Sequence, residues 1–356
     1  MAHWGVLPFA GALLVWSADR PLNETFRIPA DGLVLGRDLL DEHLRGHRDD
    51  RISRSHTRLS VEAAHVRVTD LGSRNGTFSN GHTVAESIVV TPPSILRTGR
   101  SVWVIVPDVR RYEHVPLQRR GGLVVAGTLD PLCRELDDIA NAEANVLLYG
   151  PLSIGRELAA SYAGTIGGEV VRFDPETMKV PLERVINQRS LRTLILELGS
   201  TMPERDAETL ATWLETDIRV ATVVRDLRWL NELPSELVAR LAMRRIDVPK
   251  QRFDELPAQV FEQSCAMSPA APLHATVIER CLLDSFRVDE DTLQVEVRGA
   301  LLRWCISGNP ALRGEDLDLP DSLRHNDCIH ADYHLVAPRL AAYRRGAGNL
   351  PRDEGE

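Results

Sequence analysis

Short apolar runs follow one another along the first 108 residues, and turn residues separate them. Seven such runs stand at the spacing of an all-β domain, over residues 13–16, 25–28, 33–35, 57–61, 65–68, 87–90 and 102–106. Strands this short, broken by Gly, Asn, Asp and Ser, are typical of two packed antiparallel sheets. The pattern predicts a β-sandwich over residues 1–108, with its loops gathered at one end.

A different pattern begins at residue 122, where strand-like runs alternate with helix-like segments. The strand-like runs are 145–149, 193–197 and 219–224, and the helix-like segments are 156–163 and 207–214. This alternation predicts a parallel α/β sheet over residues 122–250. Helical apolar spacing then recurs at 256–265, 275–286 and 291–305, which predicts a small helical region over 251–320.

Two segments have no apolar periodicity. Residues 109–121 combine charge, one Pro and a Gly, and we expect a linker, with solvated coil favoured over a basic contact to nucleic acid. Residues 321–356 form a poorly defined tail, loose at its end. Cys328, His330 and His334 in this tail could ligate a metal, but the spacing of a zinc site is incomplete, so no metal site is expected.

Length and charge narrow the class of protein. A chain of 356 residues, 43% hydrophobic, is long enough for two or three domains. Its net charge of -9 argues against a general nucleic-acid binder, although residues 1–120 carry 16 Arg against 13 Asp and Glu. No apolar run reaches the ~18 residues of a membrane span. Five cysteines without a CxxC pair suit a reducing compartment, so a cytoplasmic protein is expected.

Two loops of the predicted sandwich carry candidate chemistry. Residues 51–56 and 70–77 are rich in Ser, Arg, Asn and Gly. A phosphothreonine offers nearly two negative charges and three acceptor oxygens, and therefore needs a planar multi-donor cation with short donors beside it. Arg37 supplies such a cation, Ser53 a hydroxyl and a loop amide, and Arg54 a second cation. The loops therefore indicate a phosphate-binding site.

These residues resemble a known family in their order along the chain. Gly36-Arg37, Ser53-Arg54-Ser55-His56, Ser73-Arg74-Asn75-Gly76-Thr77 and Asn80-Gly81 follow the pattern of the forkhead-associated (FHA) domain without departure, over about the first third of the chain. The resemblance implies phosphothreonine binding by Arg37, Ser53, Arg54, Arg74 and Asn75. In the family, the residue at Arg74 lines the phosphate and methyl pocket, and the amide at Asn75 clamps the peptide backbone.

Other residues of the pattern have a structural interpretation. An Asn-Gly pair is also an ordinary hairpin turn, and a buried histidine more often ties loops together than acts as a base. We expect five residues to hold the shape of the loops: Gly36, His56, Gly76, Asn80 and Gly81.

The α/β region resembles a second family, the AAA+ domain of sigma-54-dependent transcriptional activators. Residues 150–157 stand where the Walker A loop would lie, but the expected lysine is Arg156 and the middle glycine is Ser153. Residues 192–198 are similar to the Walker B strand, with Glu197 where two carboxylates are expected. Residues 217–227 are similar to the next strand of the family, with valines in place of the sensor asparagine, and residues 233–241 also resemble the family.

Missing chemistry decides what this second resemblance implies. No segment between residues 157 and 193 resembles the hairpin that binds the sigma factor, and the departures fall on nearly every catalytic position. We therefore expect no catalytic residue, and a vestigial nucleotide site at Gly150, Gly155, Arg156 and Glu197. No cofactor is expected, although backbone donors at the helix start leave ATP binding open. The helices after residue 250 would be the small lid that follows such a core.

The favoured function is phosphothreonine-dependent protein interaction, with a catalytically inactive ATPase-like domain as a second binding surface. Its partner would be a protein phosphorylated by a Ser/Thr kinase in a bacterium. One alternative is an active AAA+ ATPase that regulates sigma-54-dependent transcription under FHA control. Another is self-association, in which the FHA module of one copy binds a phosphothreonine of a second. No helix-turn-helix is evident, so DNA binding is disfavoured, and no membrane contact is expected.

Overall fold

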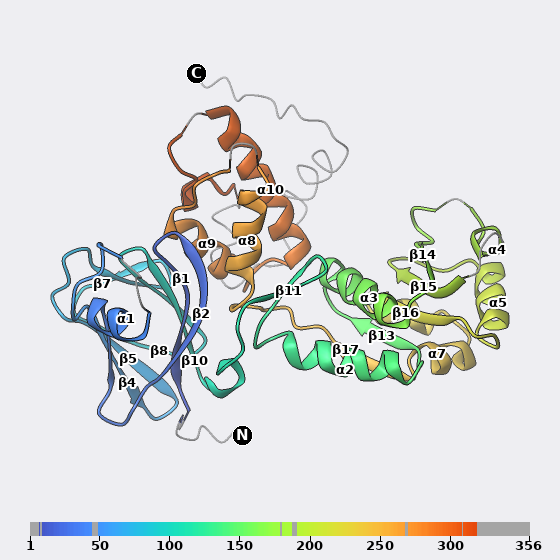
Figure 1. Ribbon diagram of the computed structural model, residues 1–356, viewed down its shortest axis with the longest axis horizontal. Coiled ribbons are helices and arrows are strands. Elements are labelled where there is room, and N and C mark those ends of the chain that lie inside the picture. The colour runs from blue at the N-terminus through green and yellow to red at the C-terminus, as the bar shows by residue number, and fades with distance from the viewer. Residues whose placement is uncertain are drawn as a thin grey trace. The chain divides into compact units, whose positions relative to one another are not determined.

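The computed structural model divides the chain into two compact units (Figure 1). Met1–Val115 and Phe253–Glu356 belong to the first unit, and Pro116–Arg252 form the second. The residues that the structure describes are 7, 9–44, 49–178, 180–186, 191–267, 270–307 and 309–318. The predicted tail over 321–356 lies outside them, and the predicted domain boundaries stay predictions.

Two antiparallel sheets form the sandwich of the first unit. The larger sheet has the order β2-β1-β10-β9-β6-β7, with β1 (Gly11–Ser17), β2 (Arg20–Arg27), β6 (Thr77–Ser79), β7 (His82–Val84), β9 (Ser94–Thr98) and β10 (Ser101–Val106). The smaller sheet has the order β3-β4-β5-β8, with β3 (Leu33–Leu35), β4 (Thr57–Glu62), β5 (His65–Asp70) and β8 (Ser87–Val90). The short helix α1 (Arg37–His43) follows β3. The predicted sandwich is confirmed, and β6, β7 and β9 are additional strands.

Two neighbouring strands of the larger sheet, β1 and β10, are buried on both faces. All seven residues of β1 and all six of β10 are buried. Leu14 and Trp103 belong to the core between the two sheets, whereas Leu13 and Val104 belong to a core on the outer face. Both strands are continuous apolar runs rather than alternating ones because each face has a partner.

Helices from the end of the chain cover that outer face. They are α8 (Leu256–Cys265), α9 (Ala275–Asp284) and α10 (Glu290–Ser307), followed by the short η2 (Gly314–Asp316). The ring of Trp16 in β1 meets Phe261 of α8 edge to face at 5.8 Å, and Nε of Arg97 donates to Glu279 of α9 at 2.5 Å. The helical region expected as a lid therefore shares its core with the sandwich.

Residues 109–121 are more ordered than the sequence suggests. A 3-10 helix, η1 (Arg110–Tyr112), and a strand, β11 (Gln118–Arg120), lie within them. Val109 and Tyr112 are buried in the core shared by the sandwich and the helices. The expectation of solvated coil is wrong for these residues because two apolar side chains anchor the segment.

The second unit is built on a parallel sheet. Its strand order is β14-β15-β16-β13-β17, with β13 (Val146–Tyr149), β14 (Glu169–Phe173), β15 (Leu191–Leu198), β16 (Arg219–Val224) and β17 (Arg244–Asp247). Its helices are α2 (Asp130–Asn141), α3 (Leu152–Ile166), α4 (Leu182–Ile186), α5 (Glu204–Trp213), α6 (Arg228–Asn231) and α7 (Ser235–Leu241). A small hairpin of β11 and β12 (Leu123–Val125) precedes them. Two apolar cores contain the buried residues of these elements, so the predicted α/β architecture is confirmed.

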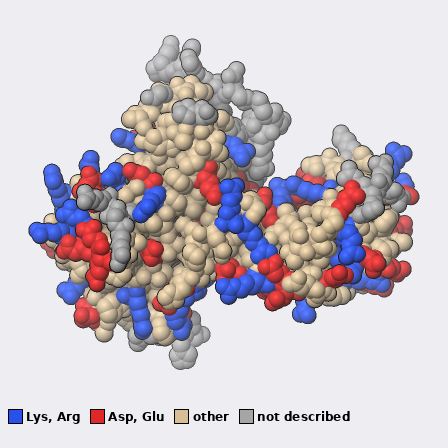
Figure 2. All heavy atoms as spheres, viewed as in Figure 1, with Lys and Arg blue, Asp and Glu red and all other residues tan. Residues whose placement is uncertain are grey.

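Acidic and basic side chains are mixed over the face shown in Figure 2. Within the described part of the chain, no helix is long and apolar enough to cross a bilayer.

Candidate functional site

Gly36 brings the end of β3 against the loop of residues 51–56. A Cβ at this position would stand 2.0 Å from the backbone oxygen of Arg54, far inside van der Waals contact. Because the glycine has no side chain, the amide of Arg37 can donate to the Ser53 carbonyl at 2.9 Å. The main chain therefore holds Arg37 beside Ser53, and the guanidinium group is not used in this contact.

His56 joins three segments and is fully buried. Its amide donates to Leu35 in β3 at 2.9 Å, and its Nδ1 accepts from the amide of Ser53 at 3.0 Å. An accepting Nδ1 requires the proton on Nε2, which then donates to the Gly76 carbonyl at 3.1 Å. Burial lowers the pKa of His56 from its ordinary value and outweighs the carbonyl of Gly76, which raises it, so the ring is kept neutral.

Asp70 fixes the second loop at its start. One carboxylate oxygen accepts from the hydroxyls of Ser73 at 2.6 Å and Thr77 at 2.5 Å, and the other accepts from the amides of Gly72 and Ser73. Burial alone would raise the pKa of Asp70, but these hydrogen bonds outweigh it and lower the pKa. Four hydrogen bonds to Asp70 thus hold together the loop of residues 70–77.

Ser53 and Asn75 keep donors and acceptors available. The hydroxyl of Ser53 accepts from the amide of Arg74 at 3.2 Å. The hydroxyl proton of Ser53 is not used in this bond and can be donated to another acceptor. The side-chain amide of Asn75 donates to the Arg51 carbonyl at 2.5 Å and keeps one N–H and its oxygen for another partner. Both loops therefore present polar groups at one end of the sandwich.

Three predicted phosphate ligands have free guanidinium groups. Within the described ranges, no carboxylate pairs with Arg37, Arg54 or Arg74. Arg54 and Arg74 are exposed, and Arg37 is half-buried. The hydrogen bonds given above join the three segments that carry the five predicted phosphopeptide ligands.

Asn80 and Gly81 lie in the hairpin that joins β6 to β7. Their φ angles are 48° and 81°, and two positive φ values in succession are those of a type I′ turn. Oδ1 of Asn80 accepts from the amide of Ile95 in β9 at 2.9 Å. Gly76, with a φ of 76°, ends the second loop just before β6. The carbonyl of Gly76 thus binds His56 directly, whereas Asn80 ties the hairpin to β9 and Gly81 completes the turn.

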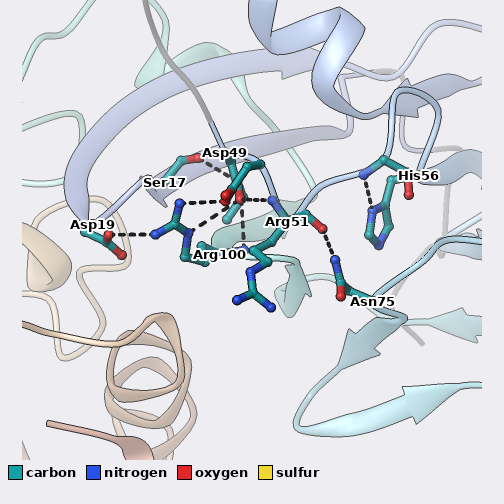
Figure 3. Close-up of polar contacts among 10 residues, drawn as sticks. Ser17, Asp19, Asp49, Arg51, His56, Asn75 and Arg100 are labelled. Atoms are coloured by element: carbon teal, nitrogen blue, oxygen red, sulfur yellow. Dashed lines mark hydrogen bonds and ion pairs between the residues drawn. The ribbon is translucent and has the colours of Figure 1, made fainter. Parts of the chain in front are cut away.

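A buried carboxylate behind the first loop escaped the sequence analysis. Asp49 is 1% exposed and accepts from the amide of Arg51 at 2.9 Å, and from the amide of Arg100 and the hydroxyl of Ser101 (Figure 3). Gly99, with a φ of 60°, lets the backbone of Arg51 approach to 2.7 Å of where a Cβ would stand. The only signal in the sequence is Gly99-Arg100-Ser101 at a tight turn, which does not identify a partner 51 residues away.

In the second unit, the predicted vestigial nucleotide site is occupied by an internal ion pair. Nε and Nη2 of Arg156 each lie 2.7 Å from one oxygen of Glu197, and Nε of Arg172 pairs with the other. Glu197 is only 2% exposed. The arginine at the Walker lysine position and the one remaining carboxylate of the Walker B strand thus neutralise each other.

Helix α3 also begins earlier than predicted. It starts at Leu152 rather than Arg156, and the amide of Gly155 already donates to the Pro151 carbonyl at 3.0 Å. Pro151 precedes the first helical residue, and no glycine interrupts residues 152–154. A phosphate-binding P-loop needs its backbone amides in a loop before the helix. Here the residues between Gly150 and Gly155 are largely helical.

Gly150 and Gly155 serve close packing in this arrangement. A Cβ at Gly150, whose φ is 151°, would meet the Val248 carbonyl oxygen at 2.6 Å, and one at Gly155 would meet the Val223 side chain at 2.5 Å. No group of three potential metal ligands occurs in the part of the chain that the structure describes, and Cys328–His334 lie outside it.

Comparisons with known proteins cover parts of the chain. Residues 33–102 match the family model of the FHA domain. No curated protein matches this chain. The FHA domain of FhaA, solved in complex with the intracellular domain of Rv3910, is 19% identical over 27% of this chain and 98% of that one, with a TM-score of 0.22. The match to the family model assigns residues 33–102 of the sandwich to an FHA domain, as the loop motifs predict.

Two further solved structures align over more of the chain. NtrX from Brucella abortus, in complex with ADP, is 16% identical over 66% of this chain and 65% of that one, with a TM-score of 0.45. The RuvB Holliday junction branch migration motor of Thermotoga maritima is 12% identical over 60% of this chain and 77% of that one, with a TM-score of 0.46.

Proposed function

We propose that this chain is a phosphothreonine-dependent interaction protein that docks through its FHA domain. The observation that carries the proposal is the group of free guanidinium groups around Ser53. Charge-assisted hydrogen bonds from arginine to phosphate are roughly twice as strong as neutral ones. A dianionic phosphate would satisfy these cations, which have no carboxylate partner among the described residues.

Each ligand would have a separate task. Arg37 would bind two phosphate oxygens through its planar fork, and the Ser53 hydroxyl would donate to the third. Arg54 and Arg74 would add positive charge, and Asn75 would bind the peptide backbone through its remaining N–H and oxygen. Because His56 and Asp70 already fix both loops, binding would order few groups and would cost little entropy.

The partner would be a protein phosphorylated on threonine by a Ser/Thr kinase. The charge of the phosphate accounts for the dependence on phosphorylation, because an unmodified threonine offers one hydroxyl to several cations. A second copy of this chain could supply the phosphothreonine instead. Mass measurement before and after phosphatase treatment would detect such self-association.

The second unit would not hydrolyse ATP. Two features support this: the ion pair between Arg156 and Glu197, and the helical conformation of residues 152–155. An incoming nucleotide would have to displace Arg156 from the buried carboxylate of Glu197 and unwind a helical turn before its phosphates could bind. Nucleotide binding is disfavoured for the same reasons.

Substitution Arg37→Ala tests the phosphothreonine proposal. Loss of one partner in a hydrogen-bonded charge pair costs about 2–5 kcal/mol, so affinity for a phosphothreonine peptide should fall at least about 30-fold. Fluorescence anisotropy with labelled peptides measures it, after a phosphopeptide library has supplied a binding sequence. Arg67→Ala is the matched control, because Arg67 pairs with Glu62 on the sandwich but lies outside the two loops. Equal affinity of the unaltered chain for the phosphorylated and the unphosphorylated peptide would contradict the proposal.

ATP turnover tests the inactive unit. We expect none above background in the purified chain. Hydrolysis that Glu197→Gln abolishes would overturn this part of the proposal and favour an active AAA+ ATPase under FHA control.

A further inference from the structure

Helix α9 is joined to the sandwich by a buried ion pair. Nε of Arg97 in β9 lies 2.5 Å from one oxygen of Glu279, 182 residues later in the chain, and the two side chains are 14% and 7% exposed. The other oxygen of Glu279 is buried and has no hydrogen-bond donor among the described residues. Desolvation makes an incompletely satisfied pair of this kind a poor source of stability. Its main effect is therefore to fix the position of Arg97.

The guanidinium group of Arg97 lies over an aromatic ring. Arg97 and Phe78 are direct partners in the pairing of β9 with β6, and the guanidinium carbon is 3.9 Å from the centre of the Phe78 ring. A cation at this distance is attracted by the electron-rich face of the ring. Because Glu279 holds Arg97 in place, Arg97 in turn restricts the movement of the Phe78 ring.

The Phe78 ring also lies against the loop that carries Asn75. A ring carbon is 3.7 Å from the position that a Cβ of Gly76 would occupy. Gly76 directly follows Asn75, the residue predicted to bind the peptide backbone. A continuous series of contacts thus leads from α9 through β9 and β6 to the second loop of the candidate site.

A second contact of α9 supports the same strand. Leu283 is four residues after Glu279 and therefore lies on the same face of the helix. Its Cδ1 is 3.4 Å from the position that a Cβ of Gly81 would occupy in the hairpin between β6 and β7. Strand β6 begins where the loop of residues 70–77 ends. Helix α9 thus holds the strand from which this loop extends.

We propose that Glu279 is a positioning residue of the phosphopeptide site, which it reaches through Arg97 and Phe78, and that docking of α9 and binding of phosphopeptide favour each other. The inference rests on the proposed phosphothreonine binding and adds the helical region to it. A loop that is already held in its binding conformation loses less entropy when the peptide binds. By linkage, a phosphopeptide bound at Asn75 strengthens the docking of α9 by the same factor.

Matched glutamine substitutions test this inference on the full chain. In Glu279→Gln, Arg97 loses the carboxylate that holds it. Affinity for a phosphothreonine peptide should then fall by about three- to tenfold, within the range by which changes along such contact networks alter coupling. Glu296→Gln is the control, because Glu296 is also buried but pairs with Arg303 of its own helix, α10, at 2.7 Å. This variant should keep the affinity of the unaltered chain. Fluorescence anisotropy measures both.

A double-mutant cycle with Asn75→Ala shows whether Glu279 acts through the second loop. The effect of Glu279→Gln on phosphopeptide affinity should largely disappear once the Asn75 side chain is gone, because the two residues then form one coupled unit. A merely structural role of Glu279 would give additive losses of affinity. Additive losses, or an equal loss of affinity in Glu296→Gln, would overturn the inference.

The remaining outcomes separate this inference from the proposed function. Full affinity in a folded Glu279→Gln would overturn the positioning role and leave phosphothreonine binding intact. Equal binding of phosphorylated and unphosphorylated peptide by the unaltered chain would instead contradict the proposed function itself. If Glu279→Gln does not fold, hydrogen exchange of the unaltered chain decides. Saturating phosphopeptide should slow exchange in α9 more than in α10, and an equal change in both helices would overturn the inference.

Discussion

Arg37 and Arg156 each directly follow a glycine, and their surroundings are opposite. Gly36 brings Arg37 to the loop of Ser53, where its guanidinium has no carboxylate partner among the described residues. Arg156 binds the buried carboxylate of Glu197 through two nitrogens. One arginine is available to a ligand, and the other already has an internal one.

Backbone conformation separates the two sites further. Around Arg37, positive φ angles, a buried histidine and a carboxylate hold irregular loops in place. Before Arg156, the chain is helical from Leu152, so Gly155 uses its amide within the helix. A glycine and a cation in sequence therefore do not make an anion site unless the amides and the cation are both left free.

Removal of both arginines that bind Glu197 should have the largest effect on stability. In Arg156→Ala with Arg172→Ala, a nearly fully buried carboxylate keeps no cation, which costs about 3–5 kcal/mol. Urea denaturation of the second unit measures the loss, and phosphopeptide affinity should not change. Glu197→Gln should cost less, because both guanidinium groups reach solvent. A larger cost for Glu197→Gln than for the double substitution would contradict this order.

Matched glycine substitutions should separate the two sites by function. Gly36→Ala forces a Cβ against the backbone of Arg54, and Gly155→Ala forces one against the side chain of Val223. We expect each to destabilise its own unit, by about 1–3 kcal/mol, with Gly36→Ala at the upper end because a backbone atom cannot turn aside. Gly36→Ala should also abolish phosphopeptide binding.

Peptide anisotropy and urea denaturation of both variants provide the measurement. Gly155→Ala is the control, since it should leave the affinity for phosphopeptide as it is. Full binding by a folded Gly36→Ala would mean that the close approach of β3 to Ser53 is not needed for the site.

Much of the fold could be predicted because apolar runs mark buried strands. The bounds predicted for β16 and α8 agree with the structure, and β1 and β10 are evident as apolar runs. The short strands β6 and β7 carry too few apolar residues to stand out. The position of the last helices could not be predicted, because the chain returns to the first unit only after the whole of the second unit, Pro116–Arg252, and no local pattern records such a distant contact.

The sequence predicts the loops of the candidate site better than it predicts the distant residues that hold them in place. Motif order predicts that Arg37, Ser53 and Asn75 meet, and the hydrogen bonds join their segments. Asp49 and Arg100 could not be paired from the sequence, because an ion pair between distant residues has no characteristic spacing. The pairing of Arg172 with Glu197 could not be predicted from the sequence for the same reason.

The smallest expected effect is a loss of stability on acidification, and it should be confined to the first unit. The second unit, Pro116–Arg252, contains no histidine, whereas burial lowers the pKa of His56 and of His274 in the first. A histidine whose pKa is lower in the folded state leaves the unfolded state to bind more protons, so its contribution to stability is complete above about pH 6.5. That contribution is lost as the pH falls from there toward the lower folded value. Calorimetry between pH 7.5 and about 5 should show only the first unit losing stability over this range.

In His56→Gln the first unit should be less stable at pH 7.5 and should lose less stability on acidification, with His274 accounting for the rest. His82→Gln, at an exposed position, is the control and should follow the unaltered chain. An unchanged pH dependence in His56→Gln would show that the neutral ring between Ser53 and Gly76 is not what the acid disrupts.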